Sequence, residues 1–164
     1  MSTKILLLGL GNIVMRDDGV GVHAANVIKE RYSFTPDVEV LDGGTLGLDL
    51  LHRFEGREKL LILDAVNFKQ EPGYIGILED DEIPAKLFQK LSVHHIGLSD
   101  LLFAAKLKDL TPAKMRLIGI QPEIIEVGLE MTDAVSGKME DLIGCAIKTL
   151  EEWNVTCVLQ SPHA

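Results

Sequence analysis

Short aliphatic runs, separated by stretches with helical spacing, are the feature that most constrains how this 164-residue chain can fold. Each run is typical of a short buried strand; the runs are residues 4–9, 38–41, 59–63, 74–78 and 115–120. Nearly continuous aliphatic strands are characteristic of parallel sheets that helices cover on both faces. The alternation therefore predicts one α/β domain over residues 1–164, a three-layer α/β/α sandwich with a twisted, mostly parallel sheet of about five strands.

Four further stretches place apolar side chains at the intervals of an amphipathic helix. They are residues 20–32, 46–54, 96–107 and 132–153. Thr45 and Thr132 stand at the start of two of them and carry the side chain of a typical N-cap. Residues 79–91 are polar and mixed, so we expect irregular or short helical structure there. Neither an internal repeat nor a linker interrupts the pattern, which favours a single domain.

The composition argues against several classes of function. Sixteen Lys and Arg against twenty-five Asp and Glu give a net charge of −9, whereas nucleic-acid binding needs a basic surface to neutralise phosphates. The apolar start at residues 5–10 is too short to span a membrane, and no small-residue cleavage site follows it. Cys145 and Cys157 form neither a paired-cysteine motif nor a disulfide framework. We therefore expect a cytoplasmic protein without membrane insertion.

Polar side chains follow the predicted strands at the ends that meet in a parallel sheet. They are Asp17, Asp18, Asp42, Asp64 and His94. The acidic pair follows the first strand, Asp42 and Asp64 end the second and third, and His94 opens a later helix. Ligands bind open α/β sheets in the crevice outside the carboxyl ends of the strands. We therefore expect these side chains to converge on one edge.

Carboxylates gathered in a poorly hydrated crevice repel one another, and a divalent cation relieves that repulsion. Two carboxylates and one histidine would leave coordination positions open for water or substrate, and such a donor set suits nickel, zinc or manganese. Loop periodicity does not distinguish His94 from His95 as the imidazole ligand. Asp18, Asp42 and His94 each also fit a cap or a turn. Asp64 is harder to explain that way, because an acid at a buried strand end is costly unless it is paired or coordinated.

Two other functions are compatible with parts of the sequence. The loop that begins at Gly9 resembles a dinucleotide-binding motif, but Val14 stands where the third glycine belongs. A receiver-like signalling module phosphorylated at Asp64 is the main non-enzyme alternative, with Asp17 and Asp18 as its acidic pair. The motifs of serine hydrolases, zincins and P-loop NTPases are not found.

Five blocks of sequence resemble one family in order along nearly the whole chain. They are G-L-G-N-I-V-M-R-D-D-G-V-G-V at 9–22, L-D-G-G-T-L-G-L-D-L-L at 41–51, L-I-L-D-A-V at 61–66, S-V-H-H-I-G-L-S-D-L-L at 92–102 and G-I-Q-P-E at 119–123. The family is the nickel-iron hydrogenase maturation endopeptidases. An ordered series of blocks is far more specific than any single glycine loop.

The resemblance implies a nickel-dependent, aspartyl-type endopeptidase that removes a C-terminal extension from the precursor of a nickel-iron hydrogenase large subunit. It assigns the metal contacts to Asp18, Asp64 and His94, with Asp18 and Asp64 as catalytic acids, and gives Asp42 a role in contacting substrate or assisting water. It further implies that the nickel is supplied by the substrate and that zinc or cadmium can replace it in vitro. A nickel-binding chaperone without peptidase activity is the alternative within this resemblance.

Overall fold

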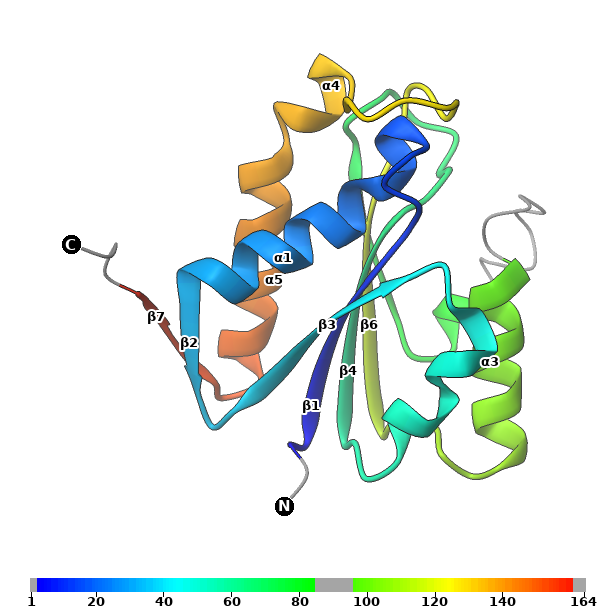
Figure 1. Ribbon diagram of the computed structural model, residues 1–164. Helices are drawn as coiled ribbons and strands as arrows, with labels where there is room; N and C mark the ends of the chain where they lie inside the picture. The colour runs from blue at the N-terminus through cyan, green and yellow to red at the C-terminus, as the bar shows by residue number, and fades with distance from the viewer. Residues whose placement is uncertain (1–2, 85–95, 161–164) are drawn as a thin grey trace.

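A single sheet forms the centre of the computed structural model, which describes residues 3–84 and 96–160. Its five strands lie in the order β3-β1-β4-β6-β5 (Figure 1). They are β1 (Ile5–Leu10), β3 (Val38–Gly44), β4 (Lys59–Ala65), β5 (Ile75–Glu79) and β6 (Lys114–Ile120). All pair in parallel except β5, which lies antiparallel to β6 at one edge. The predicted α/β class and mostly parallel sheet are confirmed.

Helices cover both faces of this sheet, as the alternation predicted. On one face lie α1 (Val20–Arg31) and α5 (Met139–Glu152). On the other lie α3 (Ile96–Leu107) and the 3-10 helix η2 (Gly47–Phe54). Figure 1 shows α1 and α5 on one side of the strands and α3 on the opposite side. The three layers follow from strands that must bury both faces.

Side chains of the central strands alternate between two separate cores. Leu7 and Leu61 pack in the core beneath α1 and α5. Leu6 and Leu60, one position earlier in each strand, pack in the core beneath η2 and α3. Successive strand residues point to opposite faces of the sheet, and here helices bury both faces. This double burial is why the strands are continuous aliphatic runs in the sequence.

The sequence did not predict four small elements. β2 (Tyr32–Thr35) and β7 (Thr156–Leu159) form a separate antiparallel pair beside the main sheet. The 3-10 helix η1 (Arg16–Gly19) precedes α1, and the short helix α4 (Asp133–Ser136) precedes α5. Each is four residues long, too short to display a reliable hydrophobic period.

The single continuous helix predicted over residues 132–153 is wrong. α4 ends at Ser136, and α5 begins only at Met139. Between them Lys138 has non-helical dihedral angles, with φ of −104° and ψ of 3°. The preceding Gly137 weakens helical continuity at this point, because glycine has a low helix propensity.

Neither of the two threonines predicted as caps makes a side-chain capping hydrogen bond, and only Thr132 occupies an N-cap position. Thr132 occupies the N-cap position of α4, but its side chain makes no capping hydrogen bond. Its hydroxyl donates instead to the carboxylate of Asp17, at 2.8 Å. The helix predicted after Thr45 is the 3-10 helix η2, whose N-cap is Leu46 and which has no side-chain cap. In both places a different backbone geometry or a distant acceptor overrides the local capping preference.

The segment predicted as irregular, residues 79–91, lies partly outside the described residues. Within residues 79–84, Glu79 ends β5 and Ile83 is buried in the core beneath α3. No helix in residues 3–84 or 96–160 combines the length and apolar character that crossing a membrane requires.

Candidate active site

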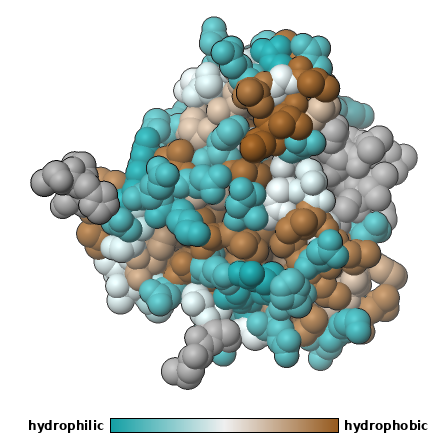
Figure 2. Space-filling view, viewed as in Figure 1, coloured by the Kyte–Doolittle hydropathy of each residue, from teal (hydrophilic) through white to brown (hydrophobic). Residues whose placement is uncertain are grey.

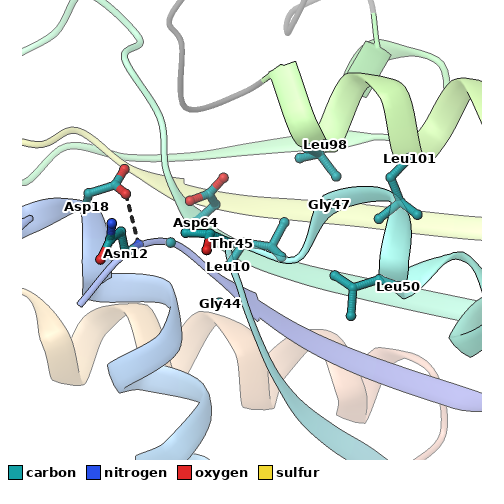
Figure 3. Close-up of a pocket in the computed structure, with 11 residues that line it drawn as sticks. Leu10, Asn12, Asp18, Gly44, Thr45, Gly47, Leu50, Asp64, Leu98 and Leu101 are labelled. Atoms are coloured by element: carbon teal, nitrogen blue, oxygen red, sulfur yellow. Dashed lines mark hydrogen bonds between the residues drawn. The ribbon is translucent and has the colours of Figure 1, made fainter. Parts of the chain in front are cut away.

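Asp18 and Asp64 line one cavity of about 210 Å³ at the carboxyl ends of the parallel strands. Figure 3 shows their carboxylates pointing into the same space. Apolar side chains form much of the remaining wall: Leu10, Leu50, Leu98 and Leu101. The sequence prediction that acids from separate strands converge on this edge is therefore correct for these two residues.

The position of Asp18 depends on tight turns around η1. Asp18 is only 3% exposed, and its Oδ2 atom accepts a hydrogen bond from the backbone N–H of Asn12 at 2.9 Å. Gly11 has φ of +130°, and a Cβ atom there would lie 1.9 Å from the Asp18 carbonyl oxygen. Position 11 must therefore be glycine for the loop to approach Asp18 so closely.

Asp64 is held by the sheet itself. It lies within β4, one residue before the strand ends, which agrees with the predicted place at the strand's carboxyl end to within one residue. Its neighbour in β6 is Gly119, and its Oδ1 atom accepts the backbone N–H of Ala65 at 2.8 Å. With 4% of its surface exposed, Asp64 is a buried carboxylate on a rigid element. Such placement fixes the direction of the carboxylate more firmly than a loop would.

Asp17, next to Asp18, faces away from the cavity. It is fully buried, and its carboxylate accepts backbone N–H groups from Glu123, Ile124 and Thr132 as well as the Thr132 hydroxyl. Burial alone would raise the pKa of Asp17, but these hydrogen bonds to the charged form outweigh it and lower the pKa below its ordinary value. Asp17 therefore fastens the segment after β6 to η1.

The sequence did not reveal this role of Asp17. The only local signal is that two adjacent acids precede a helix, and adjacent side chains in a 3-10 turn point in different directions. The backbone N–H groups that donate to the Asp17 carboxylate belong to Glu123, Ile124 and Thr132, more than one hundred residues away in the sequence. No local pattern reports a contact at that separation.

Asp42 does not line the cavity that contains Asp18 and Asp64. It lies in β3, is exposed, and borders a neighbouring hollow of about 230 Å³. The two hollows share four lining residues, which are Gly11, Asn12, Gly44 and Thr45. Asp42 is thus placed beside the two buried acids and not among them.

His94 and His95 lie outside the described residues, so the predicted imidazole ligand has no position here. Within residues 3–84 and 96–160, no group of three or more His, Cys, Asp and Glu side chains gathers as a metal site. The two carboxylates that do share the cavity are hard oxygen donors with open space between apolar walls. This donor pair fits a divalent cation that also takes ligands from elsewhere.

Comparison with known proteins relates this geometry to a family. Residues 22–149 match the family model of the hydrogenase maturation proteases. The hydrogenase 2 maturation protease of Escherichia coli (strain K12) is 37% identical over 156 residues, which are 94% of this chain and 95% of the relative. The chain belongs to the hydrogenase maturation protease family. It is accordingly a hydrolase of the endopeptidase class.

Solved structures of hydrogenase maturation proteases have the same fold. The hydrogenase maturating endopeptidase HybD from E. coli superposes with a TM-score of 0.91 and 36% identity, covering 96% of this chain and 98% of that one. HybD from Thermococcus kodakarensis, described as a NiFe hydrogenase maturation protease, has a TM-score of 0.75 and 31% identity, covering 90% and 99%. The family resemblance of the sequence blocks is thereby confirmed, and it takes the place of the receiver-like alternative.

Proposed function

We propose that this chain cleaves the C-terminal extension from the nickel-loaded precursor of a nickel-iron hydrogenase large subunit. The observation that carries the proposal is the pair of buried carboxylates, Asp18 and Asp64, facing one cavity at the carboxyl edge of the sheet. Membership in the hydrogenase maturation proteases and the similarity to the NiFe hydrogenase maturation protease HybD of Thermococcus kodakarensis support it. We further propose that the reaction takes place in the cytoplasm.

Asp18 and Asp64 contact the nickel that the precursor carries, and His94 is the third proposed contact. In this proposal nickel is part of the substrate, and zinc or cadmium can replace it in vitro. A divalent cation at this position polarises the scissile carbonyl or the attacking water. The carboxylates hold the metal-bearing segment so that the scissile bond lies beside them, and such positioning replaces a bimolecular encounter.

The leucine wall has a separate function in this proposal. Leu10, Leu50, Leu98 and Leu101 surround two carboxylates whose charges are poorly screened once a substrate fills the opening. Electrostatic attraction between carboxylate and cation is stronger where water is displaced. The cavity thus favours a precursor that brings a cation over one that does not.

Asp42 contacts the peptide or assists water from the neighbouring hollow. Its exposure leaves the carboxylate accessible to a bound chain, and Gly44, which lines the same hollow, has no side chain to block a close approach. This role is secondary because Asp42 lies outside the cavity that contains Asp18 and Asp64.

The test is to mix the purified chain with the precursor large subunit, with and without nickel, and to follow loss of the C-terminal peptide by mass spectrometry. We expect cleavage of the nickel-loaded precursor only. Equal cleavage without nickel would instead indicate an ordinary zinc-type peptidase. Tight binding without any cleavage would indicate a nickel-binding chaperone.

A further inference from the structure

Five large apolar side chains lie exposed on one side of the candidate active site, in two segments far apart in the sequence. We call them the apolar ledge; its members are Ile13, Val14, Ile125, Val127 and Leu129. Val127 is 84% exposed and Leu129 is 73% exposed. Figure 2 shows hydrophobic atoms gathered at the top of the molecule, where Figure 1 places the segment before α1. Clustered exposure of this kind marks interaction surfaces in soluble proteins.

The two segments of the ledge are joined by backbone hydrogen bonds. The Gly128 N–H donates to the Val14 carbonyl at 2.9 Å, and the Arg16 N–H donates to the Gly128 carbonyl at 3.0 Å. A parallel bridge pairs Met15 with Gly128. The apolar side chains on either side of these bonds therefore belong to one continuous surface.

Side chains of η1 also fix the ledge in place. The Asp17 carboxylate binds both ends of the segment, at Glu123 and Ile124 and again at Thr132. Arg16 donates from Nε to the Glu130 carbonyl at 2.9 Å. Val127 and Leu129 are thus presented to solvent by an anchored segment. An anchored surface loses little conformational entropy when it binds a partner.

The ledge is continuous with the candidate active site. Ile13 borders the same hollow as Asp42, and its neighbour Asn12 donates a hydrogen bond to Asp18. A protein that places a peptide against Asp18 and Asp64 has its adjoining surface over residues 13, 14 and 125–129. The position of the ledge therefore fits a contact with the body of the substrate protein.

Charge at the ledge indicates what kind of surface fits it. Exposed acids surround the apolar side chains: Glu123, Glu126, Glu130 and Asp133. Arg16 is already engaged, since its Nη1 atom donates to the Glu126 carboxylate at 3.3 Å. A second copy of this chain would bring the same acids face to face, in a protein with a net charge of −9. A partner with an apolar centre flanked by Lys and Arg is complementary.

We propose that the apolar ledge docks the folded body of the precursor large subunit, through an apolar surface of the precursor flanked by basic residues. The proposal rests on the proposed function, because it names the substrate of that same site as the partner. The ledge contributes binding of the protein, while the carboxylates engage the metal-bearing segment. Substitution in the ledge should accordingly weaken capture of the precursor without altering the cleavage step.

The test compares two double variants in cleavage of the nickel-loaded precursor. V127S/L129S removes the two most exposed ledge side chains, and V158S/L159S, on β7 away from the cavity, is the matched control. We expect V127S/L129S to raise KM by about tenfold, as loss of a central apolar contact does, with kcat within about twofold of wild type. The control variant should match wild type in both.

Each outcome has a distinct meaning. If wild type cleaves the precursor and V127S/L129S has an unchanged KM, the ledge is not the docking surface. If V127S/L129S changes the oligomeric state in sedimentation velocity and leaves KM unchanged, the ledge is a self-interface, and the proposal is overturned. If wild type neither binds nor cleaves the precursor, the proposed function itself fails, and docking fails with it.

Salt supplies a second measurement on the same proteins. Because the acids around the ledge attract a basic surface, raising the ionic strength should raise the KM of wild type. The variant E123Q/E130Q should show a smaller rise, since two of the exposed charges are gone. A wild-type KM independent of salt would refute the basic flanks of the partner surface.

Discussion

Asp17 and Asp18 are neighbours in the chain, yet their environments are opposite. The Asp17 carboxylate is enclosed by hydrogen-bond donors from residues 123–132, and Asp18 faces a cavity shared with Asp64. Both are almost fully buried. The difference shows that burial of an acid does not by itself indicate chemistry: one carboxylate binds a distant segment of the chain, and the other lines a cavity.

Asp64 extends the comparison, because it shares the cavity of Asp18 while lying on a different element. We expect Asp64→Asn to reduce precursor cleavage by about a hundredfold or more, since a neutral amide cannot attract the substrate's cation. The fold should persist, because the amide oxygen can still accept the Ala65 N–H. Cleavage followed by mass spectrometry, with melting temperature measured alongside, checks both expectations.

Asp49→Asn is the matched control for that variant. Asp49 is an exposed acid in η2 that does not line the cavity. The variant Asp49→Asn should therefore leave cleavage of the precursor unchanged. Equal activity of Asp64→Asn and Asp49→Asn would remove Asp64 from the proposed site.

Asp17→Ala should act on stability first. The substitution leaves three backbone N–H groups and one hydroxyl without their acceptor. Unsatisfied buried donors make such a change costly, so we expect the free energy of unfolding to fall by about 2 to 4 kcal/mol. Urea unfolding measures the difference. Asp37→Ala, at an exposed acid, should change it by less than about 0.5 kcal/mol; similar values for both variants would contradict the role of Asp17 as a fastening residue.

The pH dependence of stability follows from the direction of the Asp17 shift. Its folded pKa lies below the ordinary value of 3.8, so Asp17 stabilises the fold fully above that pH and loses the contribution as pH falls through the folded pKa. The stability gap between wild type and Asp17→Asn should therefore be constant at neutral pH and narrow in acid below about pH 4. A gap that widens in acid would contradict this sign.

Asp42→Asn should have the smallest effect. Asp42 is exposed and borders the neighbouring hollow, so stability should stay within about 0.5 kcal/mol of wild type. We expect kcat/KM for the precursor to fall by less than about tenfold, because the proposed function gives the residue a contact with the peptide and none with the metal. A loss as large as that of Asp64→Asn would move Asp42 into the group of primary acids.

The sequence predicted much of the fold because the signal was local. Five runs of aliphatic residues correspond to the five strands of the sheet, and α1 and α3 match their predicted spans closely. Two of the features that the sequence did not predict depended on contacts between distant residues. Thr132 bonds to Asp17 instead of capping α4, and β2 pairs with β7 at the other end of the chain.

The site divides in the same way. The sequence alone determined that Asp18, Asp42 and Asp64 lie at or just beyond the carboxyl ends of buried parallel strands, because the positions and the burial of these strands can be read from the hydrophobic pattern. Only the tertiary structure decided that Asp18 and not Asp17 faces the cavity, that Asp42 stands outside it, and that Val127 lies beside Val14. The physical reason is that the direction of a side chain in a turn is set by its hydrogen-bond partners. For Asp17 these partners lie 106 to 115 residues away.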